Sequence, residues 1–199
     1  LTENDGDLES ATEWLRKKGT ATAEKKSSRT TSEGVIARHL AADGKSGTLV
    51  EINCETDFVA KNEKFQEFCN EAATALNDDP EADLEEKRAN MVAEIGENVR
   101  FPRHQSLSID GNGAVAAYIH HGAKVGVLVA AETGKEETAG SDAFKVLLGD
   151  LALQITAASP AVVKRDDLDQ AVVEKERDFA AEQFKDKPAQ AIEKIVDGK

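Results

Sequence analysis

The chain has 199 residues, of which 40% are hydrophobic and 32% charged, and its 25 basic and 38 acidic residues give a formal net charge of −13. This composition is typical of a soluble globular protein with one or two domains, and no stretch of about 18 apolar residues predicts a membrane span. The acidic balance argues against general nucleic-acid binding, which requires clustered lysine and arginine side chains, and the opening residues LTENDGDLES resemble neither a signal peptide nor a transit peptide.

The N-terminal region is predicted to be helical and then irregular. Residues 5–18 have a helical pattern, and Gly19 is expected to end that helix. Four apolar side chains share one face of the predicted helix: Leu8, Ala11, Trp14 and Leu15. Residues 20–33 are rich in threonine, serine and lysine, so a linker is predicted there, helical in part around 21–28.

Two β-hairpins alternate with helices in the rest of the chain. Asp43-Gly44 lies between apolar runs and is a good hairpin signal, and the run GAVAAYIHHGAKVGVLVAAE predicts a second hairpin. Strands are predicted at 34–41, 47–54 and 98–109 and in the hairpin at 113–132. Helices are predicted at about 62–77, 83–95, 141–157 and 166–186, with a last one from Pro188 onward.

An internal repeat relates the two hairpin–helix blocks. With an offset of 79 residues, GTLV at 47–50 aligns with GVLV at 126–129, and the following helices stay in register. The aligned helical pairs are Phe65 with Phe144, Phe68 with Leu147, Cys69 with Leu148, Ala72 with Leu151, Ala73 with Ala152 and Leu76 with Ile155. Both rows have the spacing of one buried helical face. The predicted fold is α+β, with two related subdomains that each pack a small antiparallel sheet with helices, preceded by a partial helical N-terminal module and followed by C-terminal helices.

The repeat bears on Phe58, which follows the strand of the first hairpin. Its spacing of seven residues from Phe65 would suit a core position on one continuous helix. At the same offset, however, the segment Thr56-Asp57-Phe58-Val59 aligns with Lys135-Glu136-Glu137-Thr138, which contains no aromatic residue. The subdomain fold therefore does not require the ring. The comparison favours an exposed Phe58 that anchors a partner, and burial against an element near the first copy is the alternative.

The cysteine and histidine patterns predict no chemistry of their own. Cys54 and Cys69 form no C-x-x-C pair, and we expect them to be buried thiols in a reducing compartment. The alternatives are a single disulfide between the two cysteines and a nucleophilic thiol at Cys54. The adjacent His120 and His121 have no further ligands at a metal-binding spacing. We therefore expect neither a metal site nor a cofactor.

The stretch NCETDFVAKNEKF, residues 53–65, closely resembles the signature of the translation elongation factor Ts family. GDLESATEWLRKKG resembles the end of that family's N-terminal ubiquitin-associated-like domain, and YIHHGAKVGVLVAAE resembles the hairpin of its second core subdomain. VVEKERDFAAEQFKDKPAQAIEKIVDGK resembles the helical segment that follows. The resemblance covers essentially the whole chain.

The resemblance implies a guanine-nucleotide exchange factor that binds elongation factor Tu·GDP and promotes GDP release during translation elongation. The residues implied to enter the GTPase domain of elongation factor Tu and disturb its Mg²⁺ and phosphate site are Thr56, Asp57, Phe58 and Val59. The residues implied to contact another domain of that partner are His120, His121 and Gly122. Such a factor acts by binding and is not an enzyme. Stable binding to elongation factor Tu without efficient exchange is the alternative.

The resemblance also predicts a domain division. The expected parts are a remnant of the N-terminal ubiquitin-associated-like domain at 1–19, a linker at 20–33, core subdomain N at 34–96, core subdomain C at 97–165, and a truncated helical hairpin for dimerisation or coiled-coil formation at 166–199. Nucleic acid and membranes are not expected as partners, and a homodimer or a 2:2 complex with elongation factor Tu stays open. The expected compartments are a bacterial cytoplasm, the chloroplast stroma or the mitochondrial matrix.

Overall fold

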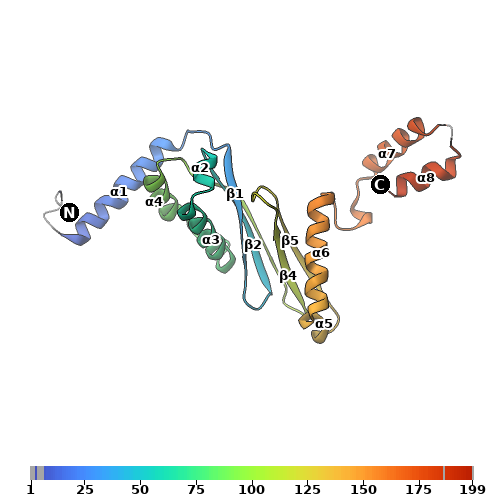
Figure 1. The fold of residues 1–199 in the computed structure, drawn as a ribbon, viewed down its shortest axis with the longest axis horizontal. Coiled ribbons are helices and arrows are strands. Elements are labelled where there is room, and N and C mark those ends of the chain that lie inside the picture. Colours follow the sequence, from blue (N-terminus) through green and yellow to red (C-terminus); the bar gives the residue numbers. More distant parts are fainter. Residues whose placement is uncertain (1–2, 4–6, 186, 199) are drawn as a thin grey trace. The chain divides into compact units, whose positions relative to one another are not determined.

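The computed structural model describes residues 3, 7–185 and 187–198 of the chain, which divide into two compact units, Leu1–Ala157 and Ala158–Lys199 (Figure 1). In the first unit the elements are α1 (Leu8–Lys26), β1 (Glu33–Leu40), β2 (Ser46–Cys54), α2 (Asp57–Ala60), α3 (Glu63–Asp78), α4 (Glu85–Ile95), β3 (Arg100–Ser108), β4 (Gly113–Ile119), β5 (Gly126–Glu132), α5 (Glu136–Gly140) and α6 (Asp142–Ala158). Among the described residues, no helix has both the length and the apolar content needed to cross a membrane.

The first unit contains two antiparallel sheets. The first sheet has the order β1-β2-β3, and the second is the hairpin β4-β5. Val35 lies opposite Ile52 in the first hairpin, and Tyr118 lies opposite Val127 in the second. The predicted α+β class with two small antiparallel sheets and packed helices is confirmed.

The internal repeat is visible in the element bounds. The offset of 79 residues places β1, β2, α2 and α3 on β4, β5, α5 and α6, and each bound agrees to within one residue. The predicted helices and hairpins of this region are therefore confirmed, and the chain builds the same strand–strand–turn–helix unit twice.

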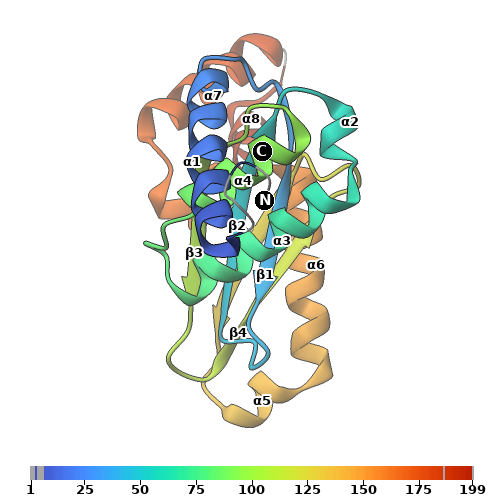
Figure 2. The ribbon, with the colours of Figure 1, turned by 90° about the vertical axis from the view of Figure 1, so that its left-hand side faces the viewer.

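The main hydrophobic core lies between α3 and the first sheet. Alternate residues of β2, among them Val50, Ile52 and Cys54, point to one side of the sheet and are buried. All six predicted apolar positions of α3 are buried against them: Phe65, Phe68, Cys69, Ala72, Ala73 and Leu76. Figure 2 shows α3 lying along β1, and this packing makes the end of β2 a rigid base for the residues that follow it.

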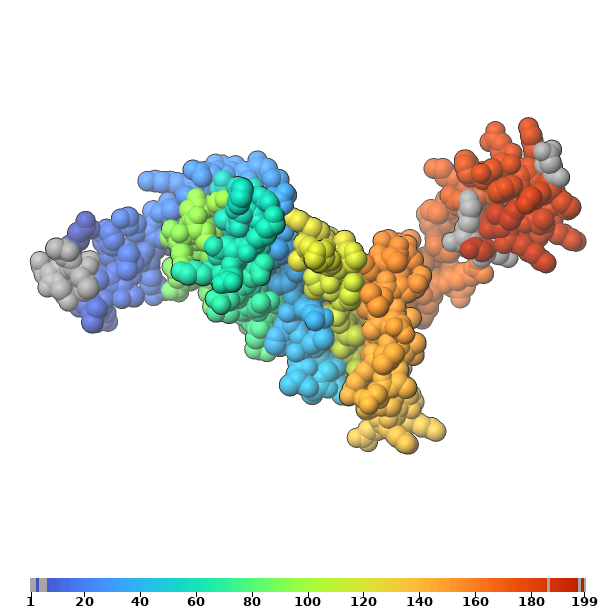
Figure 3. All heavy atoms as spheres, viewed as in Figure 1, coloured from blue at the N-terminus to red at the C-terminus, as the bar shows by residue number. Residues whose placement is uncertain are grey.

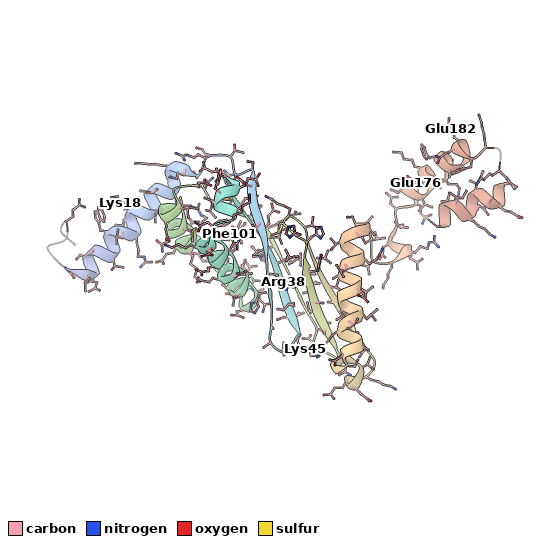
Figure 4. All side chains as sticks on the ribbon, viewed as in Figure 1. Lys18, Arg38, Lys45, Phe101, Glu176 and Glu182 are labelled. Carbon is pink, nitrogen blue, oxygen red and sulfur yellow. The ribbon has the colours of Figure 1, made fainter. Side chains whose placement is uncertain are left out.

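The second hairpin is held against the first sheet by hydrogen bonds at both ends of β1. Near its start, the Ile36 N–H donates to the Ala123 carbonyl at 2.8 Å. Near its end, the Val115 N–H donates to the Gly44 carbonyl at 2.8 Å, and the Lys45 ammonium donates to the Gly111 carbonyl at 2.8 Å. Figure 4 labels Lys45. These bonds fix the tip of the β4–β5 hairpin beside the start of β1.

The expectation that Gly19 ends the first helix is wrong, because α1 continues through it to Lys26. Gly19 is buried where α1 packs on α4, and a Cβ added there would lie 3.6 Å from the side-chain oxygen of Asn90. Since this is an ordinary van der Waals distance, the packing of α1 on α4 carries the helix through Gly19 and does not require the missing side chain. Of the four apolar residues predicted to share a face, Ala11 is buried and Leu8, Trp14 and Leu15 are exposed; the buried residues of α1 are Ala11, Gly19 and Ala23.

The predicted burial of the whole α6 stripe is also wrong. Phe144, Leu148 and Ala152 are buried, but Leu147 is 52% exposed and Leu151 is 40% exposed. In the first copy, the counterpart of Leu147 is Phe68, whose ring lies 5.8 Å from the ring of Phe101 on β3. β3 pairs with β2 in the first sheet, although it falls within the range assigned to core subdomain C. Within the described residues the second sheet has two strands, so less sheet surface covers α6.

The second unit contains the short 3₁₀ helix η2 (Arg165–Asp167), α7 (Gln170–Gln183) and α8 (Ala189–Asp197). The Asp169 side chain caps α7 by accepting from the Ala171 N–H at 2.9 Å, and Pro188 is the N-cap residue of α8. The two predicted C-terminal helices are confirmed. The domain boundaries given above stay a prediction.

Candidate functional site

The Thr-Asp-Phe-Val segment supplies the N-cap residue and the first three residues of a single helical turn, α2, between β2 and α3. Thr56 is the N-cap residue in an extended conformation, and its hydroxyl accepts a hydrogen bond from the Val59 N–H at 3.4 Å. Lys61 ends the turn, and the Asn62 side chain caps α3 by accepting from the Phe65 N–H at 3.3 Å. The chain therefore starts two helices in quick succession.

The four residues of this turn divide into an outward pair and an inward pair. Phe58 is 82% exposed, and Asp57 beside it is also exposed. Val59 packs against the hydrophobic core, and Ala60 is buried in it. Figure 3 shows the teal segment that contains α2 on the outer surface of the first unit. The expected exposure of Phe58 is confirmed, while its role in binding stays a prediction.

Glu97 holds this turn from a distant part of the chain. One of its carboxylate oxygens accepts from the N–H groups of Glu55 and Thr56, each at 3.0 Å, and the other accepts from the Thr56 hydroxyl at 2.7 Å. Hydrogen bonds to a charged acceptor are stronger than those between neutral groups. The residues that enter α2 are thus fixed in place although they lie at the surface.

The charge beside Phe58 is paired within the turn. The Lys61 ammonium lies 2.7 Å from the Asp57 carboxylate, and this hydrogen bond, together with the nearby positive charge, lowers the pKa of Asp57 below its ordinary value. Asp57 is therefore ionised at neutral pH. Both side chains are exposed, so a cationic or hydrogen-bond donor group of a partner could take the place of Lys61. The Asp57 carboxylate would then stay paired when the partner excludes water from it.

The second predicted contact, His120-His121-Gly122, forms the tip of the β4–β5 hairpin. His120 and His121 are exposed, and the Tyr118 hydroxyl lies 3.2 Å from Nδ1 of His120. Gly122 has φ +85°, a left-handed conformation that most side chains disfavour, so glycine suits this turn. The structure places the histidines on one rigid tip, and their role stays a prediction.

The two predicted contact segments lie at the same end of β1. The Lys124 ammonium, next to the hairpin tip, donates to the Glu33 carboxylate at 2.6 Å and to the Gly34 carbonyl at 3.0 Å. Glu33 pairs with Cys54, and α2 begins shortly after Cys54 (Figures 1 and 2). The topology therefore brings the two segments, far apart in the sequence, to one end of the first unit.

Both cysteines are free and buried, as predicted. Burial raises the pKa of the Cys54 thiol to about 11 and raises that of Cys69 as well. This environment is opposite to the one that activates a thiol nucleophile, which needs an accessible sulfur and a lowered pKa.

We expect both thiols to resist alkylation in the folded protein. At pH 8, about one Cys54 thiol in a thousand would be ionised, and it would still be shielded from the reagent. Mass spectrometry after brief iodoacetamide treatment should find both cysteines unmodified in native protein and both modified in urea. Rapid modification of Cys54 without denaturant would contradict this account of its environment.

Sequence reasoning missed Glu97 and Lys61. Lys61 could have been found, since Asp57 and Lys61 have the i, i+4 spacing of a helical ion pair. Glu97 lies 41 residues from Thr56 in the sequence, and no motif around it predicts a contact. The contact is apparent only in the structure, where the residues that follow α4 lie next to the end of β2.

Comparison with known proteins gives consistent results. The family model described as elongation factor TS matches residues 55–199. Elongation factor Ts of Trichlorobacter lovleyi is 42% identical over 216 residues, covering 100% of this chain and 69% of that protein. Elongation factor Ts of Hydrogenovibrio crunogenus is 42% identical over 215 residues, with coverages of 100% and 69%. Elongation factor Ts of Desulfovibrio desulfuricans is 39% identical over 210 residues, with coverages of 100% and 73%.

Proposed function

The chain belongs to the elongation factor Ts family, and is thus a translation elongation factor that acts with elongation factor Tu; from this we propose that it is a guanine-nucleotide exchange factor. In this proposal, the first unit binds elongation factor Tu·GDP and promotes the release of GDP. The relatives come from bacteria, which favours a bacterial cytoplasm as the place of action. A homodimer or a 2:2 complex stays a prediction.

The observation that carries the proposal is the 82% exposure of Phe58 on a turn that is held by Glu97 and anchored through Val59. A large aromatic ring in water is unfavourable for solubility but supplies the apolar anchor typical of binding hot spots. Because the turn is already ordered in the free protein, little conformational entropy has to be lost when the ring enters a pocket of the partner.

Each outward residue has a separate role in the proposed mechanism. The Phe58 ring enters the GTPase domain of elongation factor Tu near its Mg²⁺ site and displaces side chains there. The Asp57 carboxylate exchanges its contact with Lys61 for donors of the partner and sets the orientation of the turn. The nucleotide's phosphates then lose part of their electrostatic stabilisation, and GDP dissociates. No covalent bond is broken, so no general acid, base or nucleophile is required.

The second contact would keep the partner oriented while the ring enters. The β4–β5 hairpin tip with His120, His121 and Gly122 lies at the same end of β1 as α2, so both could face one partner. Its proposed target is a second domain of elongation factor Tu. Thr56 and Val59 belong to the proposed site as residues that hold the turn, since Thr56 is bonded to Glu97 and Val59 packs on the core.

Exchange requires differential binding. The factor must bind the nucleotide-free form of elongation factor Tu more tightly than the GDP-bound form, since equal affinity for both forms would shift nothing. The coupling is reciprocal, so nucleotide expels the factor as strongly as the factor expels nucleotide. A coupling of about 4 kcal/mol would lower the affinity for GDP roughly a thousandfold.

Stopped-flow release of fluorescently labelled GDP from elongation factor Tu tests the proposal. We expect the release rate to rise with the concentration of the factor and to approach a maximum far above the spontaneous rate. Binding without faster release would support the alternative, a stable partner of elongation factor Tu that does not exchange its nucleotide. A parallel pull-down of nucleotide-free elongation factor Tu establishes that the two proteins bind in either case.

A further inference from the structure

We propose that Glu97 is the positioning residue of the exchange site, an inference that rests on the function proposed above. Its carboxylate lies on the segment between α4 and β3, outside the Thr-Asp-Phe-Val turn. It nevertheless accepts three hydrogen bonds there, from the Glu55 N–H, the Thr56 N–H and the Thr56 hydroxyl. The orientation of Phe58 therefore depends on a residue that does not itself belong to the turn.

Thr56 caps α2 locally, and Glu97 supplies the reciprocal half of a capping box, which this turn lacks. In a capping box, a glutamate at the third helical position bonds the N–H of the N-cap residue. In α2 the third helical position is Val59, whose side chain packs on the core and cannot accept a hydrogen bond. Glu97 makes the missing bond to the Thr56 N–H from outside the helix. A single helical turn is unstable by itself, so this external cap adds to the packing of Val59 and Ala60 in keeping α2 ordered.

The backbone on either side of Glu97 is itself held in place. Gly96 ends α4 in a left-handed conformation with φ +77°, which turns the chain so that Glu97 faces the end of β2. The next residue, Asn98, is fully buried, and its backbone N–H donates to the Glu55 side chain at 2.6 Å. The Asn98 amide also donates to the Arg29 carbonyl at 2.9 Å. Glu97 is thus fixed between α4, the end of β2 and the segment after α1.

The second copy of the repeat gives an internal comparison. The turn equivalent to α2 is α5, whose N-cap residue, Lys135, makes no side-chain capping bond. α5 carries Glu137 where α2 carries Phe58. In α5 the Lys135 N–H donates to the hydroxyl of Thr133, two residues earlier, at 3.4 Å, whereas in α2 the Thr56 N–H donates at 3.0 Å to a carboxylate 41 residues away. The turn that presents the aromatic ring thus has the charged cap, and this is the arrangement expected if the cap preorganises the ring for binding.

A double-mutant cycle on GDP release tests this role. We expect Glu97→Ala to lower the maximal release rate about tenfold, equivalent to ~1.4 kcal/mol of lost stabilisation. If Glu97 acts by orienting Phe58, then Glu97→Ala should have less than about a twofold effect in a Phe58→Ala background. Glu97→Gln keeps the shape and one acceptor oxygen, and should recover most of the lost rate.

Two additions make the cycle interpretable. Glu94→Ala is the matched control, because Glu94 lies on α4 and pairs with Lys64 but makes no bond to the turn, and we expect it to release GDP at the wild-type rate. If Glu97→Ala does not fold, then Thr56→Val takes its place, since it keeps the shape of the side chain and removes the hydroxyl that donates to Glu97 and caps the Val59 N–H. Its loss of rate should likewise disappear in the Phe58→Ala background.

The outcomes separate this inference from the proposed function. Wild-type release by Glu97→Ala, or an equal loss in both backgrounds, would overturn the positioning role while leaving the exchange function intact. Wild-type release by Phe58→Ala would overturn the proposed exchange site itself. Faster amide hydrogen exchange at Glu55 and Thr56 in folded Glu97→Ala, with unchanged exchange in α3, is the expected structural signature.

Discussion

Replacing Phe58 with alanine is expected to lower the factor-stimulated rate of GDP release about thirtyfold, the factor that corresponds to roughly 2 kcal/mol for a binding hot spot. The melting temperature should change little, because the ring is 82% exposed and contributes little to the folded core. Stopped-flow release and thermal unfolding followed by circular dichroism measure the two effects on the same preparation.

The matched control for this variant is Glu137→Ala. Glu137 occupies the position equivalent to Phe58 in the second copy of the repeat and is also exposed. It should leave both the release rate and the melting temperature near their wild-type values. A large loss of stability in Phe58→Ala would contradict the account, since it would mean that the ring supports the fold rather than a contact with the partner.

Replacing Phe68 with alanine is expected to destabilise the first unit by about 3–5 kcal/mol, the usual range for truncating a buried phenylalanine. Its ring is 6% exposed and lies between Phe65 and Phe101, with centroid distances of 6.2 Å and 5.8 Å. The truncation would leave a cavity between α3 and β3 that the surrounding helices and strands cannot close. Urea unfolding should show a lower midpoint for this variant.

Leu147→Ala is the natural control for that experiment, because Leu147 is the counterpart of Phe68 in the repeat and is 52% exposed. We expect it to change the free energy of unfolding by less than about 1 kcal/mol. Equal destabilisation by the two substitutions would contradict the finding that the two copies pack their helices differently.

The sequence predicted the structure best in the internal repeat, where the strands and the helices align with the same offset. The 79-residue offset related GTLV to GVLV, and the same offset relates α2 to α5 and α3 to α6 in the structure. Because both copies of a repeat form the same fold, a residue type that one copy lacks is not required for that fold. The exposure of Phe58 followed from it, because the equivalent position in the second copy has no aromatic residue and yet forms the same turn.

The errors arose where a residue's role depends on a distant element. Gly19 had the form of a helix stop, but it is buried in the contact between α1 and α4, which continues the helix through it. Leu147 had the spacing of a core residue, but the strand that covers its counterpart Phe68 has no equivalent among the described residues of the second sheet. Glu97 had no pattern at all. Helical periodicity reports which residues share a face, but not which other element covers that face.

The central claim is that Phe58 stabilises the nucleotide-free form of elongation factor Tu more than its GDP-bound form. Isothermal titration calorimetry of the wild-type chain and of Phe58→Ala against both forms measures this directly. We predict that the substitution weakens binding to nucleotide-free elongation factor Tu at least about tenfold more than binding to the GDP-bound form. Equal losses of affinity for the two forms would contradict the claim, because a ring that contributes equally to both cannot drive exchange.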